Sequence, residues 1–303
     1  MITETPRIWE SHFGFNNLDD WPLVKGNLQL TAAIKAAVAA GGLLVPAFYS
    51  KYEHYVQQDK SEYTKWDGQS EMLARTIIRH FEPQAKIMGE ELSPNADVSG
   101  EDFWAIDGID GTTNFTRRIP VCNVTLAKIE KGQVEVGVVF DFLNKGLYYA
   151  VRGGGAYHNG QQIHASNVPF NESVITFAPL LNVRKGKGLT EGLEVEALWQ
   201  GMKEISEKSR RFHREFQSGG LELAWVAEGK LEGYASSWTN PWDLSAGALL
   251  VEEAGGIVTN IFNEPWKPGY YGVIAGNLLV HKEMIDILKR KRDVLGKKEE
   301  RVI

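Results

Sequence analysis

Two carboxylates three positions apart carry the strongest chemical signal in this sequence. Asp107 and Asp110 follow a short apolar run, and Gly111 and two threonines come directly after them. Carboxylates that leave a strand into a glycine-rich turn can converge on one point. Two aspartates and the Ile109 carbonyl would then offer the oxygen ligands that Mg²⁺ prefers. The segment therefore predicts a magnesium site.

The residues that follow these acids also suit an anion. If Gly111, Thr112 and Thr113 open a helix, their backbone N–H groups and the helix dipole can hold a phosphate beside the metal. Asp, Gly and Thr also make ordinary turns and helix caps, so the spacing alone leaves a purely structural interpretation open.

Three blocks of sequence, in matching order, resemble the signatures of the inositol monophosphatase family. The segment 104–115, Trp-Ala-Ile-Asp-Gly-Ile-Asp-Gly-Thr-Thr-Asn-Phe, is similar to the central signature. Upstream, 89–93 (Gly-Glu-Glu-Leu-Ser) resembles the Gly-Glu-Glu-Ser segment, and downstream 242–256 resembles the C-terminal signature. The three ordered blocks make the resemblance specific, and with weaker echoes it covers roughly residues 28–288.

The resemblance implies a phosphoric monoester hydrolase that uses two or three Mg²⁺ ions and is sensitive to lithium. Its substrate would be a small alcohol phosphate, either inositol monophosphate or a related sugar phosphate. Metal-activated water would attack the phosphate without a covalent intermediate. Histidinol phosphate or a nucleotide phosphate stays open as substrate, and so does a non-catalytic regulatory protein on the same fold.

The resemblance also assigns roles to individual residues. The implied metal ligands are Glu90, Asp107, the Ile109 carbonyl, Asp110 and Asp243. The implied catalytic residues are Glu90, Asp107 and Thr112. Of these, Thr112 would help to orient the attacking water. The implied substrate contacts are Gly111, Thr112, Asp110, Ser236 and Asp243.

Some of these residues have ordinary structural explanations. Glu90 can be a surface acid, and Asp243 can cap a helix that begins at Leu244. Glu91 either supports the implied metal ligand Glu90 from outside the metal site or is an ordinary acid exposed to solvent. The glycines at 153–155 lack the following helix of a nucleotide loop, so they predict a turn.

One position departs from the family pattern in the machinery that activates water. Ser61 stands where the resemblance implies an aspartate that works with Thr112. A serine is not an effective base at neutral pH. We therefore expect Asp59, Glu62 or Glu90 to substitute, or the metal to acidify the water unaided.

Two further departures concern specificity and backbone geometry. Ser236 stands where inositol-selective members carry an acid that binds ring hydroxyls, and a hydroxyl accepts weaker hydrogen bonds than a carboxylate. Gly108 replaces a commoner proline, which predicts a looser backbone around the Ile109 carbonyl.

Composition narrows the partners and the compartment. The formal net charge of −6 leaves no basic footprint, so we expect no nucleic-acid partner. The single cysteine, Cys122, excludes an intrachain disulfide, and no Cys/His spacing suggests zinc. With no apparent secretory signal, the chain is expected in the cytoplasm. Segment 31–48 predicts a buried helix rather than a membrane span, and the resemblance implies a homodimer.

The order of expected elements defines the fold class. Helices come first, the second capped by Asp67 and running over 69–81. An antiparallel meander over 121–151 follows, and then alternating strands and helices. We predict an α+β protein, a layered α-β-α-β-α sandwich of the sugar-phosphatase type. Its predicted parts are an N-terminal arm (1–27), an α+β half with the metal motif (28–165), an α/β half (166–288) and a charged tail (289–303).

Overall fold

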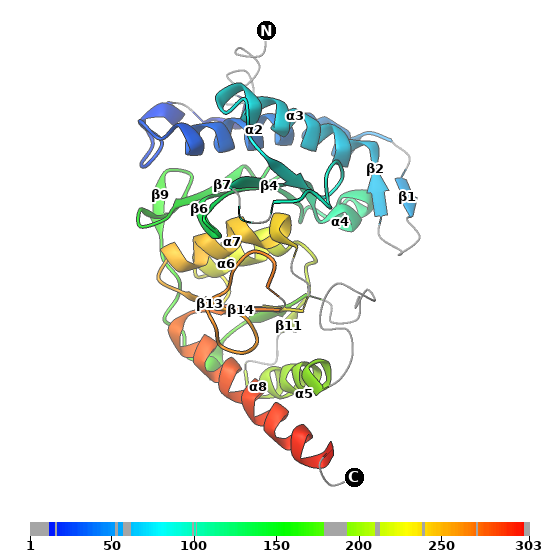
Figure 1. Ribbon diagram of the computed structural model, residues 1–303, viewed down its shortest axis with the longest axis vertical. Coiled ribbons are helices and arrows are strands. Elements are labelled where there is room, and N and C mark those ends of the chain that lie inside the picture. The colour runs from blue at the N-terminus through cyan, green and yellow to red at the C-terminus, as the bar shows by residue number, and fades with distance from the viewer. Residues whose placement is uncertain are drawn as a thin grey trace.

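The computed structural model arranges the chain as five stacked layers, helix, sheet, helix, sheet and helix (Figure 1). This confirms the predicted layered α+β sandwich. The structure describes residues 12–15, 17–51, 54–56, 62–98, 100, 102–178, 193–209, 213–237, 240–270 and 272–299.

The elements follow one another in an order close to that expected. The helices are η1 (Leu18–Asp20), α2 (Leu28–Tyr49), α3 (Lys65–Phe81), α4 (Thr112–Arg117), η2 (Phe170–Glu172), α5 (Leu193–Lys208), α6 (Gly219–Ala227), α7 (Pro241–Glu253) and α8 (Leu278–Glu299). The strands are β1 (His54–Val56), β2 (Glu62–Thr64), β3 (Ile87–Gly89), β4 (Phe103–Asp110), β5 (Asn123–Glu130), β6 (Gln133–Asp141), β7 (Gly146–Val151), β8 (Gly155–His158), β9 (Gln161–Ile163), β10 (Ile175–Phe177), β11 (His213–Arg214), β12 (Gly233–Ser236), β13 (Ile257–Thr259) and β14 (Val273–Gly276).

The alanine-rich helix α2 packs on the outer face of the first sheet. Asn27 caps it by accepting a 2.9 Å hydrogen bond from the Leu30 N–H. Gly41 lets the helix approach closely, since a Cβ there would lie 2.5 Å from the Phe140 ring. By length and composition α2 could cross a membrane, but most of it is buried inside the protein. The prediction of a buried helix is confirmed.

The first sheet has seven strands in the order β3-β4-β5-β6-β7-β8-β9, antiparallel except for the β3–β4 pair. Lys131 and Gly132 both have positive φ, which the tight β5–β6 turn requires. Along β7, Leu147 and Tyr149 face the core beneath α2, whereas Tyr148 and Ala150 face the core on the other side. The predicted meander is confirmed.

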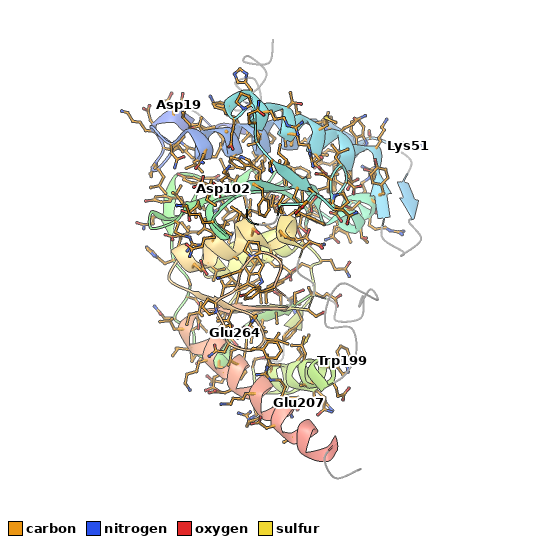
Figure 2. The ribbon with its side chains drawn as sticks, in the orientation of Figure 1. Asp19, Lys51, Asp102, Trp199, Glu207 and Glu264 are labelled. Atoms are coloured by element: carbon orange, nitrogen blue, oxygen red, sulfur yellow. The ribbon has the colours of Figure 1, made fainter. Side chains whose placement is uncertain are left out.

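The middle layer consists of α6 and α7, which lie between the two sheets (Figure 1). The second sheet is mixed, in the order β11-β10-β12-β14-β13. Its outer face packs on α5 and α8 through side chains such as Leu198 and Met284. Side chains fill the space between successive layers (Figure 2).

The N-terminal arm contributes to the first core. The Phe13 ring meets the Phe140 ring edge-on at 4.9 Å between centroids, and Phe15 is equally buried. The segment that the sequence left without a role therefore covers apolar surface of the first sheet.

Candidate metal centre

Strand β4 contains the two aspartates of the central motif. Asp107 pairs with Thr125 and Asp110 with Asn123, so β4 carries one extra residue in a bulge between them. Gly111, at φ 96°, then turns the chain into α4. A Cβ at Gly111 would lie 2.9 Å from the Val121 carbonyl oxygen, so this corner requires glycine.

Gly108, within the bulge, is where β4 touches α3. A Cβ there would overlap Ser70 Oγ and lie 2.7 Å from the Asp67 carbonyl oxygen. Gly108 therefore has a steric role in addition to the looser backbone expected from the sequence. The missing side chain allows the first turn of α3 to seat directly against the metal motif.

Three of the predicted ligands converge. Oxygens of Glu90, Asp107 and Asp243 all lie within 4.8 Å of one another, although the residues come from the segment after β3, from β4 and from α7. Asp107 is buried, while Glu90 and Asp243 are partly exposed. The site thus lies where the first sheet meets the middle helices and remains open to solvent.

Asp110 lies outside this set of three but next to it. Its Oδ2 accepts hydrogen bonds from Asn123 Nδ2 at 2.7 Å and from the Gly220 N–H at 2.8 Å. These donors fix the position of Oδ2. Burial raises the pKa of Asp110 to about 6, although the hydrogen bond from Asn123 opposes the shift.

The negative charges of the clustered acids repel one another. Burial, and next the Glu90 charge, raise the pKa of Asp107 well above its usual range. Burial, and next Asp243, do the same to the pKa of Glu90. Among the described residues no ion pair joins Glu90, Asp107 or Asp110 to a lysine, arginine or histidine.

A divalent cation fits this set of residues. It would relieve the repulsion that raises these pKa values, and a donor set made only of oxygen suits Mg²⁺ rather than zinc. Asp107 Oδ1 already accepts the Ile109 N–H at 2.8 Å, which fixes the carboxylate and leaves Oδ2 for a metal. Thr112 Oγ1 lies 3.1 Å from the carbonyl oxygen of Ile109, a predicted ligand.

Thr112 has a carboxylate partner, contrary to the sequence argument. Its hydroxyl donates to Asp67 Oδ1 at 2.7 Å. The carboxylate beside Thr112 is thus Asp67, which is not among the acids expected to substitute for an aspartate at position 61. Ser61 and Asp59 themselves, and the Glu62 side chain, lie outside the described residues.

The same aspartate belongs to a capping box rather than capping α3 itself. Helix α3 begins at Lys65 with Thr64 as N-cap, and Asp67 is its third residue. The Thr64 N–H and hydroxyl donate to Asp67 Oδ2 at 2.9 and 2.6 Å. The spacing Thr-x-x-Asp carried this signal in the sequence, because it resembles the Ser/Thr-x-x-Glu pattern of such boxes.

Ser236 and Asp243 are both predicted to contact the substrate. Ser236, on β12, is buried, with only 1% of the residue exposed. Asp243 is not the cap of a helix that starts at Leu244, because α7 already begins at Pro241. Asn240 Nδ2 donates to Asp243 Oδ2 at 3.1 Å and helps to orient that carboxylate.

The glycine-rich turn at 153–155 is a turn, as predicted. It joins β7 to β8, and the Gly153 and Gly155 N–H groups donate to the Glu253 carboxylate at 2.7 and 2.8 Å. Glu253 ends α7, so this contact ties the middle layer to the first sheet.

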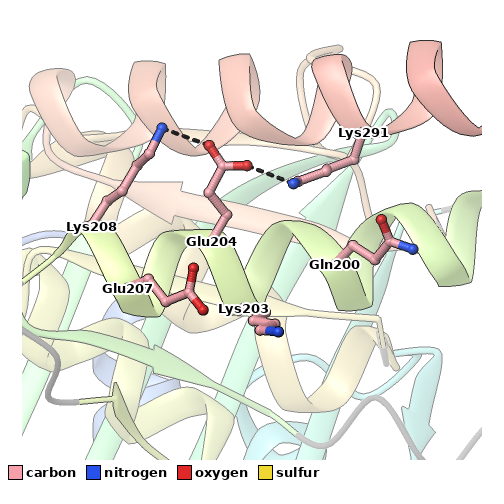
Figure 3. Close-up of a pocket in the computed structure, with 6 residues that line it drawn as sticks. All are labelled: Gln200, Lys203, Glu204, Glu207, Lys208 and Lys291. Carbon is pink, nitrogen blue, oxygen red and sulfur yellow. Dashed lines mark ion pairs between the residues drawn. The ribbon is translucent and has the colours of Figure 1, made fainter.

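A surface depression of about 520 Å³ lies between α5 and α8, on the far side of the second sheet from the acids (Figures 1 and 3). Glu204 pairs there with Lys208 and Lys291 at 2.6 Å each. These hydrogen bonds, from Lys208 first, lower the pKa of Glu204 to about 2. Three lysines and two glutamates line the depression, and Glu204 is held by ion pairs with its neighbours.

Sequence comparison places the chain among known proteins. The model of the inositol monophosphatase family matches residues 27–293. A relative named Nus factor SuhB, from Salmonella typhimurium, is 32% identical over 263 residues, which cover 84% of this chain and 94% of the relative. Another, the fructose-1,6-bisphosphatase/inositol-1-monophosphatase of Thermotoga maritima, is 32% identical over 237 residues, covering 78% and 85%.

Structural comparison agrees. Inositol monophosphatase II of Staphylococcus aureus, in a solved structure bound to inositol monophosphate, is 27% identical with a TM-score of 0.70. The match covers 88% of this chain and 95% of that one. This chain therefore belongs to the inositol monophosphatase family.

Proposed function

We propose that this protein is a Mg²⁺-dependent phosphomonoesterase that hydrolyses a small alcohol phosphate, either inositol monophosphate or a related sugar phosphate. The observation that carries the proposal is the convergence of Glu90, Asp107 and Asp243 within 4.8 Å, next to the hydrogen-bonded pair of Thr112 and Asp67. Family membership supports phosphatase activity in general, and the Staphylococcus aureus relative binds inositol monophosphate.

The ligands for the metal come from strand β4, helix α7 and the turn that follows β3. Glu90, Asp107, Asp110, Asp243 and the Ile109 carbonyl would hold two or three ions. When bound, Mg²⁺ supplies Lewis-acid chemistry, since it lowers the pKa of water and neutralises charge on the phosphate and the leaving oxygen.

Thr112 and Asp67 would orient the water that attacks. The Thr112 hydroxyl donates its proton to Asp67 Oδ1, so its oxygen lone pairs remain to accept a hydrogen bond from water. Burial raises the pKa of Asp67, against the hydrogen bonds from Thr64 and Thr112 that lower it. A carboxylate with a raised pKa is a better proton acceptor near neutral pH, which suits a general base acting through the threonine.

The proposal is tested by measuring phosphate release from inositol, sugar, histidinol and nucleotide monophosphates, with and without Mg²⁺ and lithium. We expect activity that requires Mg²⁺, is inhibited by lithium, and is abolished by Asp107→Asn and by Asp243→Asn. Asp286→Asn is the matched control, because Asp286 lies on α8 with 48% of its side chain exposed and pairs with Lys282. Unchanged activity in the Asp107 and Asp243 variants would overturn the proposal.

A regulatory protein on this fold is the second candidate, because a relative of 32% identity is named a Nus factor. The converging acids argue against a purely regulatory role, since their mutual repulsion would destabilise a protein that never binds a cation. Absence of both Mg²⁺ binding in calorimetry and phosphate release across the substrate panel would favour this candidate.

A further inference from the structure

We propose that Glu71 and Arg75, on α3, are positioning residues that hold the metal ligand Glu90 in place. This inference rests on the proposed function, because it assigns Glu90 to the metal. It goes beyond that function by identifying a buried ion pair that touches neither substrate nor metal yet sets the affinity for Mg²⁺.

The ion pair is buried directly behind the segment that carries Glu90. Glu71 is fully buried and Arg75 is 6% exposed, and Arg75 Nε donates to Glu71 Oε1 at 2.7 Å. The cost of removing two charges from water offsets most of their attraction, so a buried ion pair adds little to stability. The pair is therefore better explained by the geometry that it imposes on its neighbours.

Both members of the pair bind the Glu90 segment. Glu71 Oε2 accepts the Glu91 N–H at 2.8 Å and the Leu92 N–H at 3.3 Å. Arg75 Nη2 donates to Ser93 Oγ. Together they fasten the three residues that immediately follow Glu90.

The segment closes on itself around these contacts. The Ser93 N–H donates to the Gly89 carbonyl at 3.3 Å, and Ser93 Oγ donates to the Ile87 carbonyl at 2.8 Å. Gly89 has no room for a side chain, because a Cβ would lie 2.6 Å from Glu71 Cδ and 2.9 Å from Arg75 Nη2. The ion pair thus binds the residues after Glu90 and packs directly against Gly89 before it.

The same turn of α3 also holds the rest of the centre. Asp67, four residues before Glu71, binds Thr112, and the backbone between them seats against Gly108. Residues four apart lie on one face of a helix. One helical turn therefore sets the spacing between Glu90, the Asp107 segment and the residues that orient water.

The test is the dissociation constant of Mg²⁺, measured by titration calorimetry on folded protein. In Glu71→Gln any orientation of the amide points an NH₂ group either at Arg75 or at the Glu91 N–H, so one contact becomes a repulsion. We expect the constant to rise by about 10- to 100-fold, the usual effect of removing a group that orients a metal ligand. Arg75→Lys cannot bridge Glu71 and Ser93 together, and we expect a smaller rise.

Glu82→Gln is the matched control. It makes the same substitution at the other end of α3, where Glu82 pairs with Lys128 at 2.8 Å and accepts Trp104 Nε1 at 2.9 Å. We expect its Mg²⁺ dissociation constant to stay within about twofold of the parent protein. Unfolding midpoints in EDTA separate the two roles, since a merely structural residue lowers the midpoint without changing the affinity of the folded protein.

The outcomes distinguish this inference from the proposed function. If the parent protein binds no Mg²⁺, both are overturned. If it binds Mg²⁺ and Glu90→Gln weakens binding, while Glu71→Gln leaves the constant unchanged, only the positioning role is overturned. If Glu71→Gln does not fold, Arg75→Lys and Ser93→Ala decide the question, and unchanged constants in both overturn the inference.

Discussion

The hydroxyl of Thr112 lies 2.7 Å from Asp67 Oδ1, a contact that spans 45 residues of sequence. Both oxygens of Asp67 are taken by protein donors, because Thr64 binds the other one twice. Asp67 is therefore placed to act on Thr112 and not to hold a metal.

Replacing Asp67 by asparagine tests this assignment. The amide offers one acceptor oxygen, so it cannot accept from both Thr64 and Thr112. We expect kcat to fall by about 10²- to 10⁴-fold, the range for loss of acid–base assistance, with the Mg²⁺ dissociation constant changed only a few-fold. Steady-state kinetics and calorimetry on the same preparation measure the two quantities.

Variants of the threonine provide the control. Thr112→Ala should match Asp67→Asn, and the double variant should be little worse than either, because residues that act as a unit are not additive. Thr112→Ser keeps the hydroxyl and should lose less than about tenfold. A kcat close to that of the parent protein in Asp67→Asn would show that the contact has no part in turnover.

The buried Glu222 predicts a pH dependence of stability. It is fully buried, and burial raises its pKa to about 8, although hydrogen bonds from Ser218 and Thr176 oppose the shift. Because its pKa is raised on folding, the folded state keeps the proton longer than the unfolded state. The contribution of Glu222 to the free energy of unfolding is fully present below the pKa of the unfolded state, near 4.5. It is lost as the pH rises through the pKa of the folded state, about 8.

Glu222→Gln should remove this dependence. The amide mimics the protonated acid, so we expect the variant to match the parent near pH 5 and to be more stable at pH 9. The difference should be several kcal/mol, since one pKa unit corresponds to about 1.4 kcal/mol. Urea denaturation in EDTA at several pH values measures it. Parallel pH profiles for the two proteins would contradict the prediction.

Removal of Mg²⁺ should change stability in a way that depends on Asp107. A ligand at about 100 times its dissociation constant stabilises the folded state by about 2.7 kcal/mol. Asp107→Asn should abolish this increment. In EDTA it should be at least as stable as the parent, because it removes one of the mutually repelling charges.

Thermal denaturation with Mg²⁺ and in EDTA measures both the stabilisation by Mg²⁺ and the stability of the metal-free protein. Asp286→Asn, at a half-exposed position on α8, should keep the full increment. An Asp107→Asn protein that Mg²⁺ still stabilises fully would place the ion elsewhere.

Gln217 stores backbone strain next to the site. Its φ is 56°, in the left-handed region, and it immediately precedes Ser218, whose hydroxyl accepts from Asn123. A non-glycine residue in this region costs about 1–2 kcal/mol, so Gln217→Gly should raise the free energy of unfolding by about 1 kcal/mol after the entropy cost of glycine. Urea denaturation provides the measurement.

Gln200→Gly is the opposite case. Gln200 lies within α5, where glycine should lower the free energy of unfolding by about 1 kcal/mol. A destabilised Gln217→Gly protein would mean that the side chain, which donates to Glu215 at 3.2 Å, contributes more than the strain costs.

The sequence by itself determined the features that are local. The Asp107–Thr112 motif, the buried alanine-rich helix and the meander each depend on neighbouring residues, because turn chemistry and hydrophobic period act over a few positions. The order of motifs also indicated the family and, through it, the layered fold.

Tertiary structure alone decided which acids meet. The chain has 39 acidic residues, and nothing in their spacing brings Asp243 to Glu90 or shows that Glu71 supports the Glu90 segment. Helix α3 begins one turn earlier than expected, and its third residue, Asp67, contacts Thr112. The contact with a carboxylate therefore does not depend on an aspartate at position 61. Such contacts depend on how helices seat on a sheet, and this packing is set by many side chains distant in sequence.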